Sequence, residues 1–217
     1  MSKSHREFRG GLVDSKTILE ALLFSADRPL SVANLQSCFA DSARPEKGEI
    51  RAALKALSAD YEDRSLELTE VASGFRFQVR QEYSLWVAKL LEDKPPRYSR
   101  ALLETLAIIV YRQPATRGTI EEIRGVSVSS TIIRTLLDRG WIKVVGHKEV
   151  PGRPALFATT RQFLDDFNLR TLDSLPSLSE IQAMGFESDS DTEQALERVP
   201  LQGLELAEES EETNDNI

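Results

Sequence analysis

Side chains that could carry out chemistry are sparse in this 217-residue chain. It has two histidines and one cysteine, which is too few for a metal site of ordinary composition. It has no glycine-rich loop that ends in the Lys-Ser or Lys-Thr pair used to hold nucleotide phosphates. The carboxylate pairs Glu121-Glu122 and Asp165-Asp166 diverge by about 100° on a helix of 3.6 residues per turn, so we interpret them as solvated faces. The sequence therefore predicts a chain that is not an enzyme, with no cofactor and no metal.

Cationic side chains near a predicted turn indicate a possible contact with nucleic-acid phosphate. Lys143, Lys148 and Arg153 lie in or beside the segment 146–154, which we expect to connect two strands. Nonspecific phosphate contact needs only such exposed cations. Arg153 has a second interpretation, because the preceding glycine permits an unusual φ and the following proline fixes its own. Turn geometry and phosphate contact both stay open for this residue.

The third helix of the second copy, expected to start near Ser127 or Ser129 and to end before Gly140, has few groups that could read bases. Helix-turn-helix proteins present Arg, Lys, Asn or Gln to base edges from this position. Here the exposed charges are one cation, Arg134, and one anion, Asp138, with no amide. A DNA-binding transcriptional regulator is therefore the alternative function, and protein binding is favoured.

A helical surface without a strong charge can hold another polypeptide, for example a helix in a groove. Arginine and the larger aromatic residues are enriched where such interfaces gain most of their energy. Tyr111 and Trp141 fit the core of the fold equally well, so both interpretations stay open for them. The candidate partner-binding residues are Tyr111, Arg112, Arg117, Arg134 and Trp141.

The elements that would position these residues occur twice. The apolar helix pattern at 18–24 returns 84 residues later at 102–108, and each copy is followed by a proline, Pro29 or Pro114. Each copy continues into a second and a third helix and then two short strands around a turn. Three helices and a hairpin are the winged-helix plan. The sequence therefore predicts a mainly α fold with small β-hairpins, built from tandem winged-helix domains.

Pattern and composition also locate the boundaries. Strands are predicted at 66–71 and 75–79 and again at 141–145 and 155–159, and Leu136 and Leu137 are expected in the core. The first domain is expected to close with a helix around 85–90. Consecutive prolines predict a stiff connection between the domains. The predicted segments are a flexible leader (1–13), a first winged-helix domain (14–92), a Pro-rich linker (93–98), a second winged-helix domain (99–177) and an acidic disordered tail (178–217).

The net charge of −8 is unevenly distributed. Residues 178–217 carry twelve Asp and Glu against one Arg, and the rest of the chain has a net charge of +3. Residues 14–92 have a net charge of −3 and residues 99–172 of +4. Neither domain has the concentrated positive charge of a dedicated DNA-binding protein. The tail is interpreted either as solubilising or as a competitor of nucleic acid for a basic face.

Other features indicate the compartment. Cys38 has no second cysteine to pair with and lies among apolar residues, so we expect it to be buried and inert. No apolar run approaches the ~18 residues of a membrane span. The charged start of the chain is not followed by the apolar segment of a secretory signal. We therefore expect a cytoplasmic protein that does not enter a membrane.

Several motifs in order resemble the bacterial ScpB family, segregation and condensation protein B. They are the stretch 103–114, the segments 120–126 and 132–140, and Gly152-Arg153-Pro154 with the residues that follow. The resemblance extends over roughly residues 14–180. It implies a homodimer of tandem winged-helix chains that binds the kleisin ScpA, which bridges the heads of an SMC ATPase. Such a chain would be a non-catalytic adaptor in chromosome condensation and partition during cell division.

The resemblance also implies how the parts would be used. The chain would reach the nucleoid and DNA through the complex, with weak or no DNA binding of its own. The first domain, with its apolar helix at 18–24 and Trp86, is the candidate for self-association. The second domain is the candidate for binding the kleisin.

Overall fold

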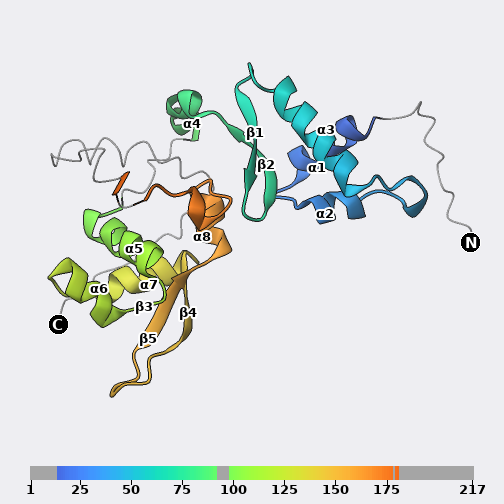
Figure 1. Ribbon diagram of the computed structural model, residues 1–217. Helices are drawn as coiled ribbons and strands as arrows, with labels where there is room; N and C mark the ends of the chain where they lie inside the picture. The colour runs from blue at the N-terminus through green and yellow to red at the C-terminus, as the bar shows by residue number, and fades with distance from the viewer. Residues whose placement is uncertain (1–13, 92–97, 178, 181–217) are drawn as a thin grey trace, which may run out of the picture.

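The computed structural model describes residues 14–91, 98–177 and 179–180 of the chain. The predicted leader, nearly all of the linker and nearly all of the acidic tail lie outside these residues. The elements form two groups, each with its own apolar core (Figure 1). We refer to residues 14–91 as the first unit and to residues 98–177 as the second unit.

In the first unit, three helices pack on a two-stranded antiparallel hairpin, and a fourth helix follows. Polar side chains define where these helices begin: Ser31 Oγ accepts the backbone N–H of Asn34 at 3.1 Å, and the backbone N–H of Glu46 donates to Glu49 at 2.7 Å. Such caps satisfy backbone groups that the first helical turn leaves unpaired. The elements are α1 (Ser15–Ser25), α2 (Val32–Ser37), α3 (Lys47–Asp60), β1 (Leu66–Val71), β2 (Gly74–Val79) and α4 (Ser84–Leu91).

The core of the first unit lies between α1, α2, α3 and one face of the hairpin. Leu19, Leu35 and Ile50 are fully buried there. Removing a side chain of this size from water contributes about 1.5–3 kcal/mol. Phe77 on β2 stacks on Phe24 with ring centroids 4.2 Å apart, which ties the hairpin to α1.

The second unit contains four helices and a three-stranded antiparallel sheet in the order β3-β5-β4. Ser99, Thr116, Ser129 and Thr160 each precede a helix and accept a backbone N–H of its first turn, so the hydroxyls set the helix starts. The elements are α5 (Arg100–Arg112), β3 (Ala115–Thr116), α6 (Arg117–Arg124), α7 (Ser130–Asp138), β4 (Ile142–His147), β5 (Ala155–Thr159) and α8 (Arg161–Asp166).

Trp141 lies in the core of the second unit and has no exposed surface. The ring centroids of Tyr98 and Phe167 are each 5.1 Å from that of the indole. Ile109 from α5 and Leu136 from α7 are fully buried in the same cluster. The core therefore joins the first and third helices of the unit to the start of its hairpin.

The internal repeat extends to a strand contact that the sequence does not reveal. In the second unit the two residues of β3, just after Pro114, pair with β5. At the corresponding place in the first unit, just after Pro29, Leu30 forms a single bridge with Phe75 on β2. In both units the segment before the second helix is thus held to the second strand of the hairpin.

The predicted fold class is confirmed in its coarse form, a helix-rich chain with small antiparallel sheets. The prediction that Cys38 is buried is wrong, because it lies exposed at the end of α2. Leu137, expected in the core, is 37% exposed. Gly146 and His147, expected in the turn of the second hairpin, belong to β4. The helix predicted around 85–90 is present as α4.

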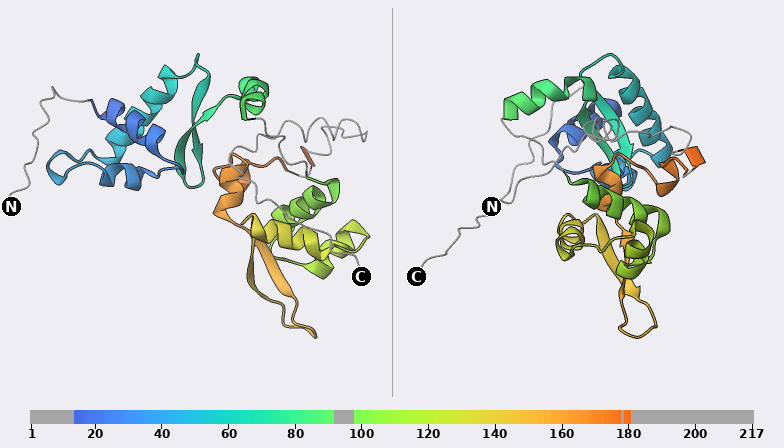
Figure 2. Two further views of the ribbon diagram at one scale, coloured as in Figure 1. Left: turned by 180° about the vertical axis from the view of Figure 1, so that it is seen from behind. Right: turned by 90° about the vertical axis from the view of Figure 1, so that its left-hand side faces the viewer.

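The two units meet where the turn of the β1–β2 hairpin lies against the end of α8 (Figure 2). The backbone N–H of Ala72 donates to the carbonyl of Leu169 at 3.0 Å. Asp165, interpreted from the sequence as solvated, is 6% exposed and accepts the backbone N–H of Ser73 at 2.9 Å. That interpretation is wrong because the Asp165 carboxylate is buried and accepts a hydrogen bond from the other unit.

Candidate partner-binding surfaces

Arg117, a predicted partner-binding residue, lies at the start of α6 and is bonded within the second unit. Its Nε is 3.1 Å from Glu121 Oε1, and its Nη1 donates to Ser130 Oγ at 3.3 Å. Its Nη2 also donates to the carbonyl of Val128. The guanidinium therefore holds the turn between α6 and α7, and part of its donor capacity is used inside the fold.

Glu121 completes this arrangement. Its Oε1 accepts the backbone N–H of Val128 at 2.9 Å as well as the Arg117 Nε. These hydrogen bonds, first that from the Val128 backbone and then that from Arg117, lower the pKa of the Glu121 carboxyl. Glu121 thus stays charged and keeps the α6–α7 turn in one geometry.

Exposed apolar side chains lie beside this turn. Ile123 near the end of α6 is 50% exposed, and Val126 just after it is 57% exposed. Gly125 between them adopts φ 73°, which ends α6 and directs the chain into the turn. We call Ile123 and Val126 the α6 patch. Exposed apolar groups next to a rigid turn are suited to contact with another protein.

Tyr111, Arg112 and Arg134 differ in how freely they could contact a partner. Tyr111 is half-buried, and its hydroxyl donates to the carbonyl of Pro176 at 2.7 Å. Burial raises the pKa of the Tyr111 hydroxyl. Arg112 is exposed at the end of α5. The Arg134 side chain is 83% exposed, with its Nε 3.6 Å from Asp138 Oδ2 on the same helix. Arg112 and Arg134 are therefore accessible, and Tyr111 is accessible only in part.

Trp141, the remaining candidate, is not on the surface. Its side chain is fully buried and its Nε1 donates to Asp166 Oδ2 at 2.8 Å. Of the two interpretations left open by the sequence, the core interpretation is correct and a partner contact is not possible in this structure. Asp166, expected to be solvated, is instead the acceptor for the indole.

The β4–β5 hairpin carries the three predicted phosphate-contacting cations, with Lys143 on β4 and the other two in the turn. Lys143 and Lys148 are exposed. Arg153 is exposed too, but its Nη2 is 3.2 Å from Glu149 Oε1. Its φ of 37° and the bond from its backbone N–H to the carbonyl of Val150 at 2.9 Å give it a role in the turn. The lysines thus offer charge, while Arg153 contributes to turn geometry and is paired with a carboxylate.

α4 is the most exposed apolar segment of the described residues. None of its side chains is buried. Leu85 is 78%, Trp86 68% and Leu90 81% exposed. Soluble chains rarely leave so many large apolar groups together in water unless another surface covers them.

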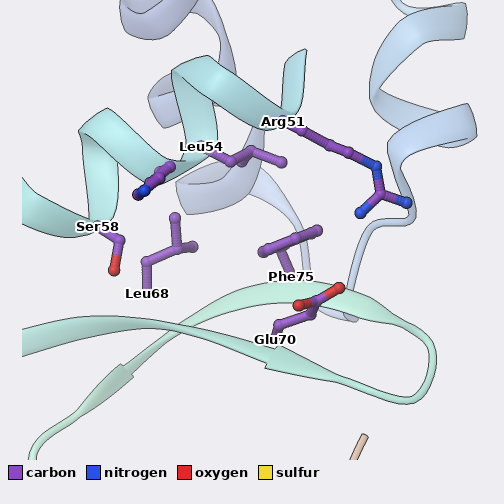
Figure 3. Close-up of a pocket in the computed structure, with 7 residues that line it drawn as sticks. Arg51, Leu54, Ser58, Leu68, Glu70 and Phe75 are labelled. Atoms are coloured by element: carbon purple, nitrogen blue, oxygen red, sulfur yellow. The ribbon is translucent and has the colours of Figure 1, made fainter. Parts of the chain in front are cut away.

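A shallow groove of about 300 Å³ lies between α3 and the hairpin of the first unit (Figure 3). Leu54, Leu68 and Phe75 form its apolar floor, and the charged ends of Arg51 and Glu70 lie at its margin. The groove is open to solvent, and its lining contains both apolar and charged side chains. It lacks the enclosed shape and converging polar groups of a small-molecule site.

The part of the chain that the structure describes gives no sign of a metal centre or a membrane span. Within residues 14–91, 98–177 and 179–180, no three His, Cys, Asp or Glu side chains are grouped so as to hold an ion. No helix in the same residues has both the length and the apolar character needed to cross a bilayer.

Gln113, a residue that the sequence analysis did not single out, supports these surfaces. Its Oε1 accepts the backbone N–H of Thr159 at 2.8 Å and the Thr159 hydroxyl at 2.9 Å, and its Nε2 donates to the carbonyl of Val110 at 3.1 Å. It therefore joins the end of α5 to β5. No local pattern predicts this role, because the partners are 46 residues apart.

Comparison with known proteins gives a consistent result. Residues 17–178 match the family model described as segregation and condensation complex subunit ScpB. The segregation and condensation protein B homolog of Coxiella burnetii is 54% identical over 169 residues, which cover 78% of this chain and 81% of the relative. Segregation and condensation protein B of Syntrophotalea carbinolica is 41% identical over 180 residues, covering 82% of this chain and 89% of the relative.

Among solved structures, a dimer of a ScpB N-terminal domain complexed with a ScpA peptide is 26% identical. The match covers 39% of this chain and 99% of the chain in that structure, with a TM-score of 0.33. Two findings establish the family: the match of the family model over most of the chain and the sequence identity to the Coxiella relative. The chain belongs to the ScpB family of segregation and condensation complex subunits.

Proposed function

We propose that this chain is a non-catalytic adaptor of a condensin-like complex in which it binds the kleisin ScpA and, through ScpA, an SMC ATPase. Its work would be chromosome condensation and partition during cell division, in the cytoplasm and at the nucleoid. Membership of the ScpB family supports this role. The chain would act through binding energy, stabilising one arrangement of its partners.

We infer that both units are winged-helix domains, spanning 14–92 and 99–177 and joined by the Pro-rich linker. Each unit has three helices followed by an antiparallel hairpin. In each unit the segment before the second helix pairs with the second hairpin strand. This agreement in connectivity supports the interpretation of a repeated domain.

One observation carries the choice of a protein partner over DNA: some exposed arginines of the second unit lie beside carboxylates, whereas large apolar side chains remain exposed. Arg134 and Arg153 are examples, each within 4 Å of an acid four residues away. Paired cations release few counterions when they meet a phosphate backbone. Covering exposed apolar groups with another protein is favourable, because it removes them from water.

We assign the two units different partners. α4 would bring two copies of the chain together through its exposed apolar face, in the symmetric manner of most dimers. The second unit would hold ScpA with the α6 patch and with the accessible groups of Arg112, Arg134 and Tyr111. Arg117 would act mainly by fixing the turn that presents the α6 patch.

Titration of the purified full-length chain with ScpA, followed by calorimetry and by light scattering for stoichiometry, tests the proposal. Ile123→Ser is expected to weaken ScpA binding about tenfold, since burying a side chain of this size contributes on the order of 1.5 kcal/mol. Arg134→Ala is expected to weaken it less. Lys148→Ala is the control, because this exposed lysine lies on the β4–β5 turn, and it is expected to leave ScpA affinity unchanged.

The alternative regulator predicts a different result. Titration of the chain alone against duplex DNA at physiological salt would then give sequence-selective nanomolar binding, and Lys143→Ala and Lys148→Ala would weaken it. That outcome, together with no detectable ScpA binding, would overturn the adaptor proposal.

A further inference from the structure

The turn of the β1–β2 hairpin is bonded to the second unit through its backbone. Ala72 N donates to Leu169 O at 3.0 Å, and Ser73 N donates to Asp165 Oδ1 at 2.9 Å. A hairpin turn at the end of a small sheet ordinarily leaves such donors to water. Here two acceptors that lie more than 90 residues further along the chain replace water.

Arg76 on β2 adds side-chain bonds to the same point. Its Nη2 donates to the backbone carbonyl of Asp165 at 2.9 Å and to Asn168 Oδ1 at 2.7 Å. Nearby, Arg170 Nε lies 3.2 Å from Glu70 Oε2. Bonds of a guanidinium are directional, because its N–H groups lie in one plane. They therefore restrict the angle between the units as well as their separation.

The acceptor side is shaped independently of the hairpin. Leu169 N donates to Leu164 O at 2.7 Å and Asn168 N to Asp165 O at 3.2 Å, which is the Schellman pattern at the end of α8. Asn168 has φ 55°, the left-handed conformation that this pattern requires and that asparagine tolerates. The second unit thus holds Asp165 and Asn168 in place through its own hydrogen bonds.

The donor side is equally fixed by the first unit. Leu30 and Phe75 exchange two backbone hydrogen bonds of 2.9 Å, next to Arg76. Gly74 lies so close to Leu30 that an added Cβ would come within 2.2 Å of the Leu30 carbonyl oxygen. Val71 before the turn is 3% exposed and belongs to neither apolar core, as expected for a residue covered at a junction.

We propose that Arg76, Asp165 and Asn168 form a polar clasp that holds the two units in one orientation. The clasp, and not the Pro-rich linker alone, then sets the angle at which the second unit is presented. Directional hydrogen bonds between two preshaped surfaces favour one angle, whereas a purely apolar contact would permit sliding. The proposal concerns the chain by itself and does not depend on the proposed function.

Spin-label distance measurements on the full-length chain test the clasp. Cys38 is exposed in the first unit and serves as one labelling site, and Lys148→Cys supplies the other in the second unit. Labelled chain is mixed with an excess of unlabelled Cys38→Ser chain, so that only distances within one chain are observed. The otherwise unchanged chain is expected to give one narrow distance distribution.

Arg76→Ala is expected to broaden this distribution, and Arg76→Lys to broaden it less, because lysine keeps the charge but loses the planar fork. Amide hydrogen exchange at Ser73 is expected to accelerate about tenfold in Arg76→Ala. Arg80→Ala is the matched control. Arg80 bonds to Arg64, Tyr61, Glu62 and Glu67, all in the first unit, so its loss should leave the distance distribution narrow.

Circular dichroism of each variant shows whether both units remain folded, and Asp165→Asn provides a second variant from the other side of the clasp. A broad distribution in the chain with an intact clasp would overturn the proposal. So would an unchanged distribution and unchanged Ser73 exchange in both Arg76→Ala and Asp165→Asn.

Discussion

Trp141 and Asp166 form a hydrogen bond of 2.8 Å between Nε1 and Oδ2 in the interior of the second unit. The other oxygen of Asp166 accepts from Gln162 Nε2 at 2.7 Å, so both carboxylate oxygens are used. The indole is fully buried, and its donor has no access to water as a substitute. This pair connects the start of the β4–β5 hairpin to α8.

Trp141→Phe is expected to lower the free energy of unfolding by about 1–3 kcal/mol, because it removes the donor and leaves part of the indole volume empty. Urea unfolding of the full-length chain measures this. Lys148→Ala is the control, because this exposed side chain lies on the turn of the same hairpin, and it should change stability by less than about 0.5 kcal/mol. Equal effects of the two substitutions would contradict the buried role of Trp141.

Gly74→Ala is expected to be severely destabilising, by roughly 3 kcal/mol or more. Gly74 has φ 144°, and a Cβ there would meet the Leu30 backbone, which cannot move aside as a flexible side chain can. Gly48→Ala is the matched control, because nothing lies within 4 Å of a Cβ at that position in α3. Since alanine favours helix over glycine, Gly48→Ala should stabilise by about 0.5 kcal/mol. Thermal unfolding distinguishes the two.

Glu121 should contribute a pH-dependent part of stability. Hydrogen bonds from Val128 and Arg117 lower its pKa below the ordinary value of 4.5, so the folded state binds this proton less readily than the unfolded state. Its contribution is therefore complete above about pH 4.5 and is lost as the pH falls through the lowered pKa. Glu121→Gln should be less stable than the unsubstituted chain at neutral pH, and the difference should shrink on acidification.

The measurement for Glu121 is the melting temperature of both chains between pH 7 and pH 3. Glu122→Gln is the control, since Glu122 is an exposed neighbour on the same helix. At neutral pH, Glu122→Gln should change the melting temperature less than Glu121→Gln does. A difference for Glu121→Gln that grows as the pH falls would contradict the assigned direction.

Dimer formation through α4 predicts a large effect of its leucines on self-association. Leu85→Ser with Leu90→Ser should weaken the dimer by at least about tenfold, because each covered leucine contributes on the order of 1.5–3 kcal/mol. Sedimentation equilibrium measures the monomer–dimer constant. Ile123→Ser in the second unit leaves α4 intact and should not change it. An unaltered dimer in the double variant would place the self-association surface elsewhere.

The helices were predictable because their signals are local. Ser99 and Thr116 accept the expected backbone N–H groups, and Gly125 and Gly140 have the positive φ expected at helix ends. Apolar spacing placed Ile109 and Leu136 on buried faces. The same local rules failed for Cys38, because the six-residue helix α2 is short and buries only Leu35.

Contacts over long sequence separations were not predictable. Asp165 was interpreted as a solvated acid because adjacent carboxylates diverge on a helix, whereas its partners Ser73 and Arg76 lie about 90 residues earlier. Arg117 was identified as a contact residue from its type, but the turn that it binds is defined only once α6 and α7 are placed. For the partner surfaces, the sequence supplied accessible residues such as Arg134 and one buried residue, Trp141.

The separation of the two cores has a consequence for how the chain matures during synthesis. The side chains of the first core all come from residues 19–77, whereas those of the second come from residues 98–175. Because domains generally fold as units, N-terminal ones first, the first core can form while the remainder is still on the ribosome. The contacts of Arg76 with Asp165 and Asn168 can form only after α8 has emerged, so the relative orientation of the units cannot be set until nearly all of the second unit has been synthesised.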